Sequence, residues 1–159
     1  MTDQAAAIEI GHAAPAITLP RDGGGEVSLS DFLGKRVVVY FYPRDDTPGC
    51  TIEAVEFSGE LPAFASAETV VIGISKDSVK SHDKFRDKHQ IGVILLSDEA
   101  GDVAERYGVW GEKSMYGKTF MGIERATFLI DREGRIARIW RKVKVAGHAD
   151  EVLAAARAI

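Results

Sequence analysis

The feature that most constrains the fold of this 159-residue chain is a strand pattern that ends at a proline and passes directly into a helix pattern. Residues 35–42 form a continuous β-branched and aromatic run, which is typical of a strand buried on both faces. Pro43 ends that strand. Three residues with side-chain oxygens follow and are candidate caps of the next helix: Asp45, Asp46 and Thr47. Pro48 suits a first helical turn, and residues 51–57 continue with helical spacing.

The only cysteine of the chain, Cys50, falls in the first turn of this predicted helix. A helix N-terminus stabilises negative charge and can lower the pKa of a thiol from ~8.5 to roughly 3.5–7.5, which makes the sulfur nucleophilic. Thr47 could turn its hydroxyl toward the sulfur, and Pro43 and Pro48 could shield it from water. A buried cysteine can equally be a small apolar core residue, with Thr47 only a helix cap. The spacing alone leaves both interpretations open.

The string Pro43-x-x-x-Thr47-x-x-Cys50 resembles the active-site signature of the peroxiredoxins. Its surroundings are most similar to the subfamily called bacterioferritin comigratory protein or PrxQ. Further blocks of the chain resemble that subfamily in the same order: residues 29–35, 71–77, 95–98, 107–113 and 125–131. The resemblance therefore covers most of the chain.

By this resemblance, Cys50 is the peroxidatic cysteine. Pro43, Thr47 and Arg125 match the other members of the family's active-site set, and Glu53 matches a glutamate that pairs with the arginine. The backbone N–H groups of Cys50 and Gly49 would complete an oxyanion site. From the residues alone, Arg125 would be a surface arginine on an edge strand, and Glu53 would compensate charge at a helix N-terminus.

Periodicity and turn signals predict a single α/β domain over residues 1–159, with 1–7 as a flexible tail. An N-terminal hairpin pairs 17–19 with 26–29. The other predicted strands are 35–42, 68–75, 93–96, 124–130 and 135–140, and the predicted helices are a turn at 30–34, then 49–58, a piece from 61, 77–89, 100–107 and a final helix up to 159. This order implies a central mixed sheet flanked by helices, and the resemblance implies a thioredoxin-like fold.

Two features have open interpretations. The segment 109–123 is predicted to be a long loop whose Trp110, Met115, Tyr116 and Phe120 either cover the core or form an apolar collar around Cys50 or a subunit contact. The second feature is the pair His82 and His89, which lack companion ligands at metal spacing and are predicted to be surface or partly packed residues. No metal and no cofactor is expected.

The composition and the hydropathy pattern limit the kinds of binding partner and the cellular location that we expect. A formal net charge of −4 gives no reason to expect nucleic acid or an anionic membrane as a partner. No apolar run reaches the ~18 residues of a membrane span, and the N-terminus lacks the pattern of a signal peptide. A single cysteine agrees with a reducing compartment. We therefore expect a cytoplasmic protein, either a monomer or a weakly associating homodimer.

The expected activity is thiol-dependent reduction of hydrogen peroxide and organic hydroperoxides through a Cys50 sulfenic acid. Many PrxQ-type proteins carry a resolving cysteine five residues after the first, where this chain has Val55. A one-cysteine cycle is therefore expected, with thioredoxin or glutathione and glutaredoxin as the external reductant. The alternatives are a peroxide sensor or redox-dependent chaperone that uses the same cysteine with little turnover, and a binding module in which Cys50 is structural.

Overall fold

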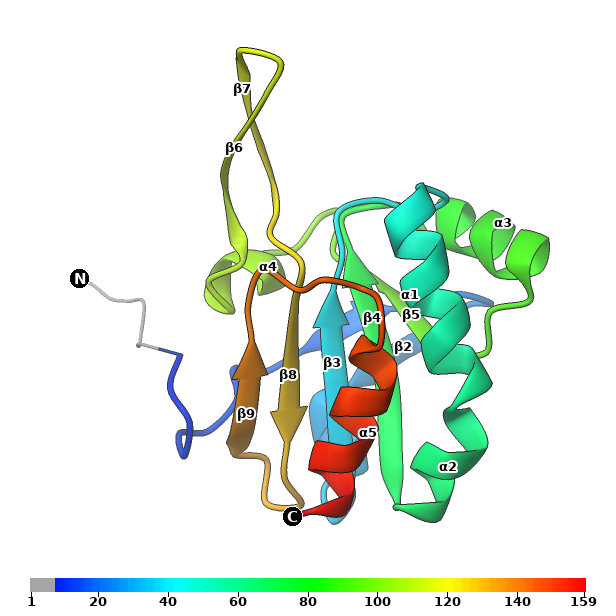
Figure 1. Ribbon diagram of the computed structural model, residues 1–159, viewed down its shortest axis with the longest axis vertical. Helices are drawn as coiled ribbons and strands as arrows, with labels where there is room; N and C mark the ends of the chain where they lie inside the picture. The colour runs from blue at the N-terminus through cyan, green and yellow to red at the C-terminus, as the bar shows by residue number, and fades with distance from the viewer. Residues whose placement is uncertain (1–7) are drawn as a thin grey trace.

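The computed structural model describes residues 8–159, so the tail predicted for 1–7 lies outside the described residues. Its centre is a five-stranded sheet in the order β5-β4-β3-β8-β9 (Figure 1). The strands are β3 Arg36–Phe41, β4 Thr69–Ser75, β5 Ile94–Ser97, β8 Ala126–Ile130 and β9 Ile136–Trp140. Strands β3, β4 and β5 run parallel, whereas β8 and β9 pair antiparallel. The predicted central mixed sheet is confirmed.

Strand β3 lies in the middle of this sheet because it can be buried on both faces. Residues 37–41 are all buried, as the continuous apolar run predicts. Val38 and Tyr40 point into one core, and Val37, Val39 and Phe41 into the other. The alternation along one strand therefore divides the hydrophobic core into two layers.

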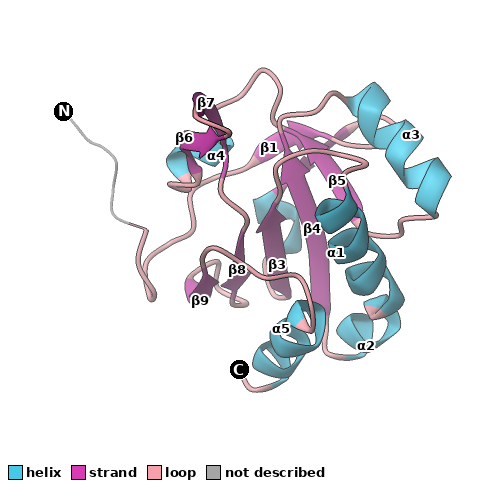
Figure 2. Ribbon diagram, turned by 45° about the horizontal axis from the view of Figure 1, so that its top comes forward, coloured by secondary structure: helices cyan, strands magenta, loops and turns pink. Residues whose placement is uncertain are grey.

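The four longer helices cover one of these layers. They are α1 Pro48–Gly59, α2 Leu61–Ser66, α3 Val79–His89 and α5 His148–Arg157, and Figure 2 shows α1, α2 and α5 along one side of the strands. The opposite layer is covered by the N-terminal hairpin, the 3₁₀ turn η1 Leu29–Phe32 and the short helix α4 Val103–Arg106. The hairpin strands are β1 Thr18–Pro20 and β2 Glu26–Ser28. Helices thus flank both faces of the sheet, as predicted.

The segment 109–123 is not a loop, which corrects the prediction. It is a hairpin of β6 Trp110–Met115 and β7 Lys118–Ile123 that projects from the body of the protein (Figure 1, yellow). Its turn has positive φ at Tyr116 (54°) and at Gly117 (76°), as a two-residue hairpin turn requires. Most of the hairpin is exposed, so its strands lack the alternation of buried and exposed residues that would reveal them in sequence. Met115, Tyr116 and Phe120 are exposed and therefore do not cover the core.

Helix α4 is shorter than predicted. It begins at Val103 rather than near Ala100, because the buried Asp98 carboxylate accepts the backbone N–H of Val103 (3.1 Å) and of Ala104 (2.8 Å). These bonds satisfy two of the free donors of the first turn and fix the start of the helix there. Gly108 follows the end of α4 with φ +72°, the left-handed conformation that a glycine commonly adopts where a helix ends.

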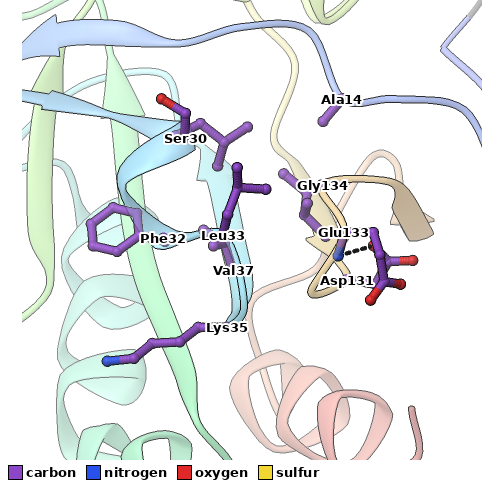
Figure 3. Close-up of a pocket in the computed structure, with 11 residues that line it drawn as sticks. Ala14, Ser30, Phe32, Leu33, Lys35, Val37, Asp131, Glu133 and Gly134 are labelled. Carbon is purple, nitrogen blue, oxygen red and sulfur yellow. Dashed lines mark hydrogen bonds between the residues drawn. The ribbon is translucent and has the colours of Figure 1, made fainter.

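A hollow of about 220 Å³ lies at the opposite end of the sheet from Cys50, next to the first residues of β3 (Figure 3). Apolar side chains such as Phe32 and Leu33 line it, together with Lys35 and Glu133. The Glu133 backbone N–H donates to Asp131 Oδ1 at 3.0 Å within the tight turn that forms one wall. None of the predicted site residues borders this hollow.

Candidate active site

The loop between β3 and α1 carries Pro43 and Thr47, and Cys50 follows in the first turn of α1. The helix begins at Pro48, one residue before the predicted start, with Pro48 in its first turn as expected, and Cys50 is 1% exposed. Thr47 occupies the N-cap position, but its hydroxyl donates to the carbonyl of Arg44 at 2.9 Å and does not cap the helix. The first turn therefore keeps backbone N–H groups that are free to face negative charge.

The predicted capping by Asp45 and Asp46 is also wrong. The carboxylate of Asp45 bonds Ser81 and His82 of α3, and that of Asp46 pairs with Lys88 and His89 near the end of the same helix. A capping carboxylate would also form charge-assisted bonds, but on α3 the cation of Lys88 adds an opposite charge and Asp45 gains two side-chain partners at once. Both aspartates therefore bind the loop to α3 instead of capping α1.

Arg125 lies beside Cys50, although 75 residues separate them in the chain. β3 and β8 are antiparallel neighbours, and Phe41 pairs with Ala126. This register brings the residue before β8 to the edge of the sheet where β3 ends and α1 begins. The strand is interior, so the edge-strand interpretation of Arg125 is wrong.

The guanidinium of Arg125 bridges two groups on α1. Its Nη2 donates to Cys50 Sγ at 3.3 Å, and its Nη1 donates to Glu53 Oε1 at 2.6 Å. Burial alone would lower the pKa of Arg125, but the adjacent Glu53 and Cys50 raise it above its usual value. The arginine therefore remains a cation beside the sulfur at every physiological pH.

Glu53 lies one helical turn after Cys50 and is 1% exposed. Burial raises the pKa of its carboxyl to about 7, against the opposing charge and hydrogen bond of Arg125. Among residues 8–159, its second oxygen, Oε2, has no hydrogen-bond partner. The carboxyl is thus poised to gain or lose a proton near neutral pH.

Gly49 has a packing role that sequence reasoning did not identify. A Cβ atom at this position would lie 3.2 Å from Nη2 of Arg125. The absence of a side chain lets the guanidinium lie against the first turn of α1. The prediction for Gly49 concerned its backbone N–H only, and that role stays a prediction.

Sequence reasoning also missed Tyr40, which packs under the site from β3. Its ring stacks on Phe57 of α1 with centroids 4.7 Å apart. Its hydroxyl lies over Gly73, where a Cβ would come within 2.8 Å of that oxygen. Burial raises the pKa of this phenol, and the charges of Glu53 and Cys50 raise it further. Tyr40 thus stays a neutral phenol at the base of the site, a role that its place in an apolar run does not reveal.

We expect Glu53→Gln to change the pH dependence of stability. The folded-state pKa of Glu53 is about 7 and its ordinary value is 4.5. Between these values the unfolded chain has released the proton while the folded chain keeps it, so the wild-type free energy of unfolding falls as pH rises across this window. Glutamine does not titrate. The unfolding free energy of the variant relative to wild type should therefore increase from pH 5 to pH 8, by on the order of 2–3 kcal/mol.

Urea unfolding of both proteins at pH 5, 6, 7 and 8 measures this difference. Val55→Gln, which places the same amide at an exposed position of the same helix, is the control and should give a pH-independent difference, because neither valine nor glutamine titrates. A flat difference for Glu53→Gln as well would contradict the raised pKa.

Comparisons with known proteins agree on one family. The model of the AhpC/TSA family matches residues 10–139. The chain is 53% identical over 146 residues to a putative peroxiredoxin Bcp of Coxiella burnetii, covering 92% of this chain and 97% of that protein. It is 51% identical over 146 residues to peroxiredoxin Bcp of Bacillus subtilis, covering 92% and 93% of the two chains.

Solved structures give the same result. A cysteine-to-serine variant of PrxQ from Xylella fastidiosa superposes with a TM-score of 0.90 at 41% identity, covering 96% of this chain and 98% of that one. The bacterioferritin comigratory protein of Xanthomonas campestris, whose alkyl peroxide reduction activity has been described, superposes with a TM-score of 0.87 at 45% identity and covers 94% and 98% of the two chains. The thioredoxin-like fold expected from the sequence is confirmed.

Proposed function

Because the chain belongs to the AhpC/TSA family, within its Bcp/PrxQ group of peroxiredoxins, we propose that it reduces peroxides by a one-cysteine mechanism. The assignment of peroxidase activity follows from membership of this family. The observation that carries the mechanism is Arg125, which contacts Cys50 and Glu53 at once in a chain with a single cysteine. The proposed catalytic residues are Cys50, Thr47, Arg125 and Pro43, with Glu53 and Gly49 supporting them.

The first step is attack of the Cys50 thiolate on one oxygen of the peroxide. An S–O bond forms and the O–O bond breaks, so that sulfur is oxidised to a sulfenic acid while the other oxygen leaves as hydroxide or alkoxide and takes up a proton. Arg125 and the backbone N–H groups of Gly49 and Cys50 stabilise the charge that develops on the leaving oxygen. Arg125 needs no reorganisation for this role because its guanidinium already lies 3.3 Å from Cys50 Sγ.

Thr47 and Pro43 orient and protect the reacting atoms. The single hydroxyl proton of Thr47 is already donated to Arg44, so its oxygen is left to accept a bond from the O–H of the peroxide. Pro43 has no N–H and is half-buried between β3 and the loop, where it limits the access of water to the thiolate. The substrates are hydrogen peroxide and organic hydroperoxides, the latter in line with the alkyl peroxide reduction described for the Xanthomonas relative.

The sulfenic acid is resolved by an external thiol. Val55, 45% exposed on α1, occupies the position of a resolving cysteine, so no disulfide can form within the chain. One thiol attacks the sulfenic sulfur, forms a mixed disulfide and releases water; a second thiol then attacks the mixed disulfide and regenerates Cys50. Since Cys50 is 1% exposed, the reductant needs local opening of the first turn of α1.

Peroxide consumption with separate reductants tests this proposal. Dithiothreitol, a thioredoxin system and a glutathione–glutaredoxin system are supplied in turn, and Cys50 is followed by intact-protein mass spectrometry. We expect one physiological system to sustain turnover and a mixed disulfide to accumulate when the second thiol is withheld. A Cys50–Cys50 dimer as the only reducible species would falsify the monothiol cycle. Oxidation by one equivalent of peroxide without turnover in any system would favour a peroxide sensor or redox-dependent chaperone instead.

A further inference from the structure

A buried ion pair between His82 and Asp45 lies behind the loop that leads into Cys50. His82 is 0% exposed and the Asp45 side chain is 3% exposed, so the sequence-based prediction of a surface or partly packed histidine is wrong. His82 Nδ1 lies 2.7 Å from Asp45 Oδ2, and its Nε2 lies 2.8 Å from the carbonyl of Leu96 on β5. The peroxidase mechanism described above uses neither residue.

Both ring nitrogens of His82 face oxygen atoms that only accept hydrogen bonds. A neutral imidazole carries one N–H and would leave a lone pair against one of those oxygens, whereas the doubly protonated ring donates to both. Burial lowers the pKa of His82, but the hydrogen bond and charge of Asp45 outweigh it and the net pKa is raised. The arrangement therefore fits an imidazolium paired with a carboxylate.

Both carboxylate oxygens and the backbone N–H of Asp45 form hydrogen bonds. Its Oδ1 accepts the hydroxyl of Tyr42 at 2.6 Å, and its Oδ2 accepts the hydroxyl of Ser81 at 2.8 Å in addition to His82. Its backbone N–H donates to Oδ2 of Asp77 at 2.8 Å. Since Asp45 is the central residue of the loop 43–47, these bonds attach the middle of the loop to Tyr42 directly after β3, to α3 and to the segment after β4.

The residue that follows Asp45 has an unusual backbone conformation. Asp46 has φ +57°, in the left-handed region that few residues with a side chain adopt and that aspartate tolerates better than most. Thr47 follows, and its carbonyl accepts the first helical bond of α1 from Thr51 at 2.8 Å. The position of Asp45 therefore fixes where α1 starts, and with it the 3.3 Å contact of Cys50 with Arg125.

We propose that His82 is a positioning residue for the peroxidase reaction. Held between Asp45 and Leu96, it fixes the loop 43–47 so that the first turn of α1 presents Cys50 to Arg125. His82 contacts no reacting atom and acts only through Asp45. This role rests on the proposed function, since it concerns the rate at which the same cysteine reacts.

The role has a pH signature. The groups that face His82 are Asp45 in the loop, Asp77 after β4, the Leu96 carbonyl of β5 and Tyr42 directly after β3, whose Oη lies 3.5 Å from His82 Nδ1. The folded-state pKa of His82 is raised, so its contribution is complete below the unfolded value of about 6.5 and is lost as pH rises through the folded value. Above that value the ring loses one of its two bonds, and the reaction of Cys50 with peroxide should slow.

The test compares His82→Gln and His82→Leu with wild type by stopped-flow oxidation with hydrogen peroxide from pH 5 to pH 10. We expect the rate constant at pH 7 to fall about 10-fold or more in both variants, and the decline at alkaline pH to be present in wild type and absent in the variants. Arg86→Gln breaks other ion pairs of α3 and leaves the loop untouched, so its rate should stay within about twofold of wild type. Alkylation of Cys50 by iodoacetamide, which does not need Arg125, should change far less than the reaction with peroxide.

Two measurements keep the proposal testable if the His82 variants fold poorly. Tyr42→Phe removes one bond to Asp45 and should lower the peroxide rate in the same direction by a smaller factor. Nitrogen-15 NMR of the wild-type ring should show both nitrogens protonated at pH 7. A neutral ring at that pH, or unchanged peroxide rates and pH profiles in folded variants, would overturn the positioning role. A wild-type Cys50 that does not react with peroxide would instead refute the proposed function, which the NMR result does not depend on.

Discussion

Replacing Cys50 with serine abolishes peroxide reduction, with an expected loss of at least ~10³-fold in the rate of peroxide consumption. The thiolate supplies both the nucleophile and the two electrons that reduce the peroxide, and the chain has no second cysteine to replace it. A serine hydroxyl is not ionised at neutral pH and cannot be oxidised in this way. The residual rate should equal that of the reductant alone.

The control for Cys50→Ser is Val55→Ser, which places the same residue on an exposed position of the same helix. Its peroxide rate should match wild type. Thermal unfolding of all three proteins establishes that they are folded at the assay temperature. Retention of more than a tenth of the wild-type activity by folded Cys50→Ser would mean that another group reduces the peroxide, and the proposed function would be wrong.

Replacing Arg125 with glutamine gives the second largest effect, a decrease of about 10²–10³ in the rate constant of Cys50 with peroxide. The change removes the cation that contacts Cys50 Sγ at 3.3 Å and holds Glu53 at 2.6 Å. Arg125→Lys keeps one charge but cannot reach both groups with a planar fork, so an intermediate rate is expected. The rate constants are measured by stopped-flow under single-turnover conditions.

The same variant should lose stability in a pH-dependent way. Removing one partner of a buried ion pair costs roughly 3–5 kcal/mol when the other group stays charged. Glu53 has a pKa of about 7 even with Arg125 present, so without the arginine it takes up a proton more readily and part of that cost is avoided at low pH. We therefore expect a larger loss of unfolding free energy at pH 8 than at pH 5.

A double variant separates the two roles of Arg125. In Arg125→Gln with Glu53→Gln, no buried charge is left on that side of the site, so stability should return toward wild type while the peroxide rate stays low. Recovery of the rate together with stability would mean that Arg125 acts only by keeping the fold intact. Equal rates for wild type and Arg125→Gln would remove the arginine from the mechanism.

The residues alone predict the central strand, the approximate start of α1 and the position of Cys50 in its first turn. A β-branched run that ends at Pro43 is typical of a buried strand, and within a helix Pro48 is tolerated only in the first turn. These signals are local, because each depends on the allowed backbone angles of one or two residues. The family resemblance added Arg125 and Glu53, which no local pattern distinguishes from surface charges.

Other features were decided by tertiary structure. The register of β3 against β8 brings Arg125 to Cys50 across 75 residues, and no spacing in the sequence reveals it. Asp45 and Asp46 have the sequence pattern of helix caps, but α3 offers charged partners that the local pattern does not contain. The hairpin β6–β7 was not predicted because most of it is exposed. Apolar and polar residues therefore do not alternate along its strands as they do in a strand with one buried face.

His82 shows most clearly the difference between what the sequence predicts and what the tertiary structure decides. Its spacing in α3 places it on one face of a helix, and a lone histidine there is compatible with any degree of burial. Only the folded chain sets an Asp45 carboxylate against one ring nitrogen and a Leu96 carbonyl against the other. The sequence by itself determined most of the elements and where along the chain the thiol lies. The charge state of the groups around that thiol was decided by tertiary structure, because burial and long-range partners, rather than local backbone preference, set a pKa.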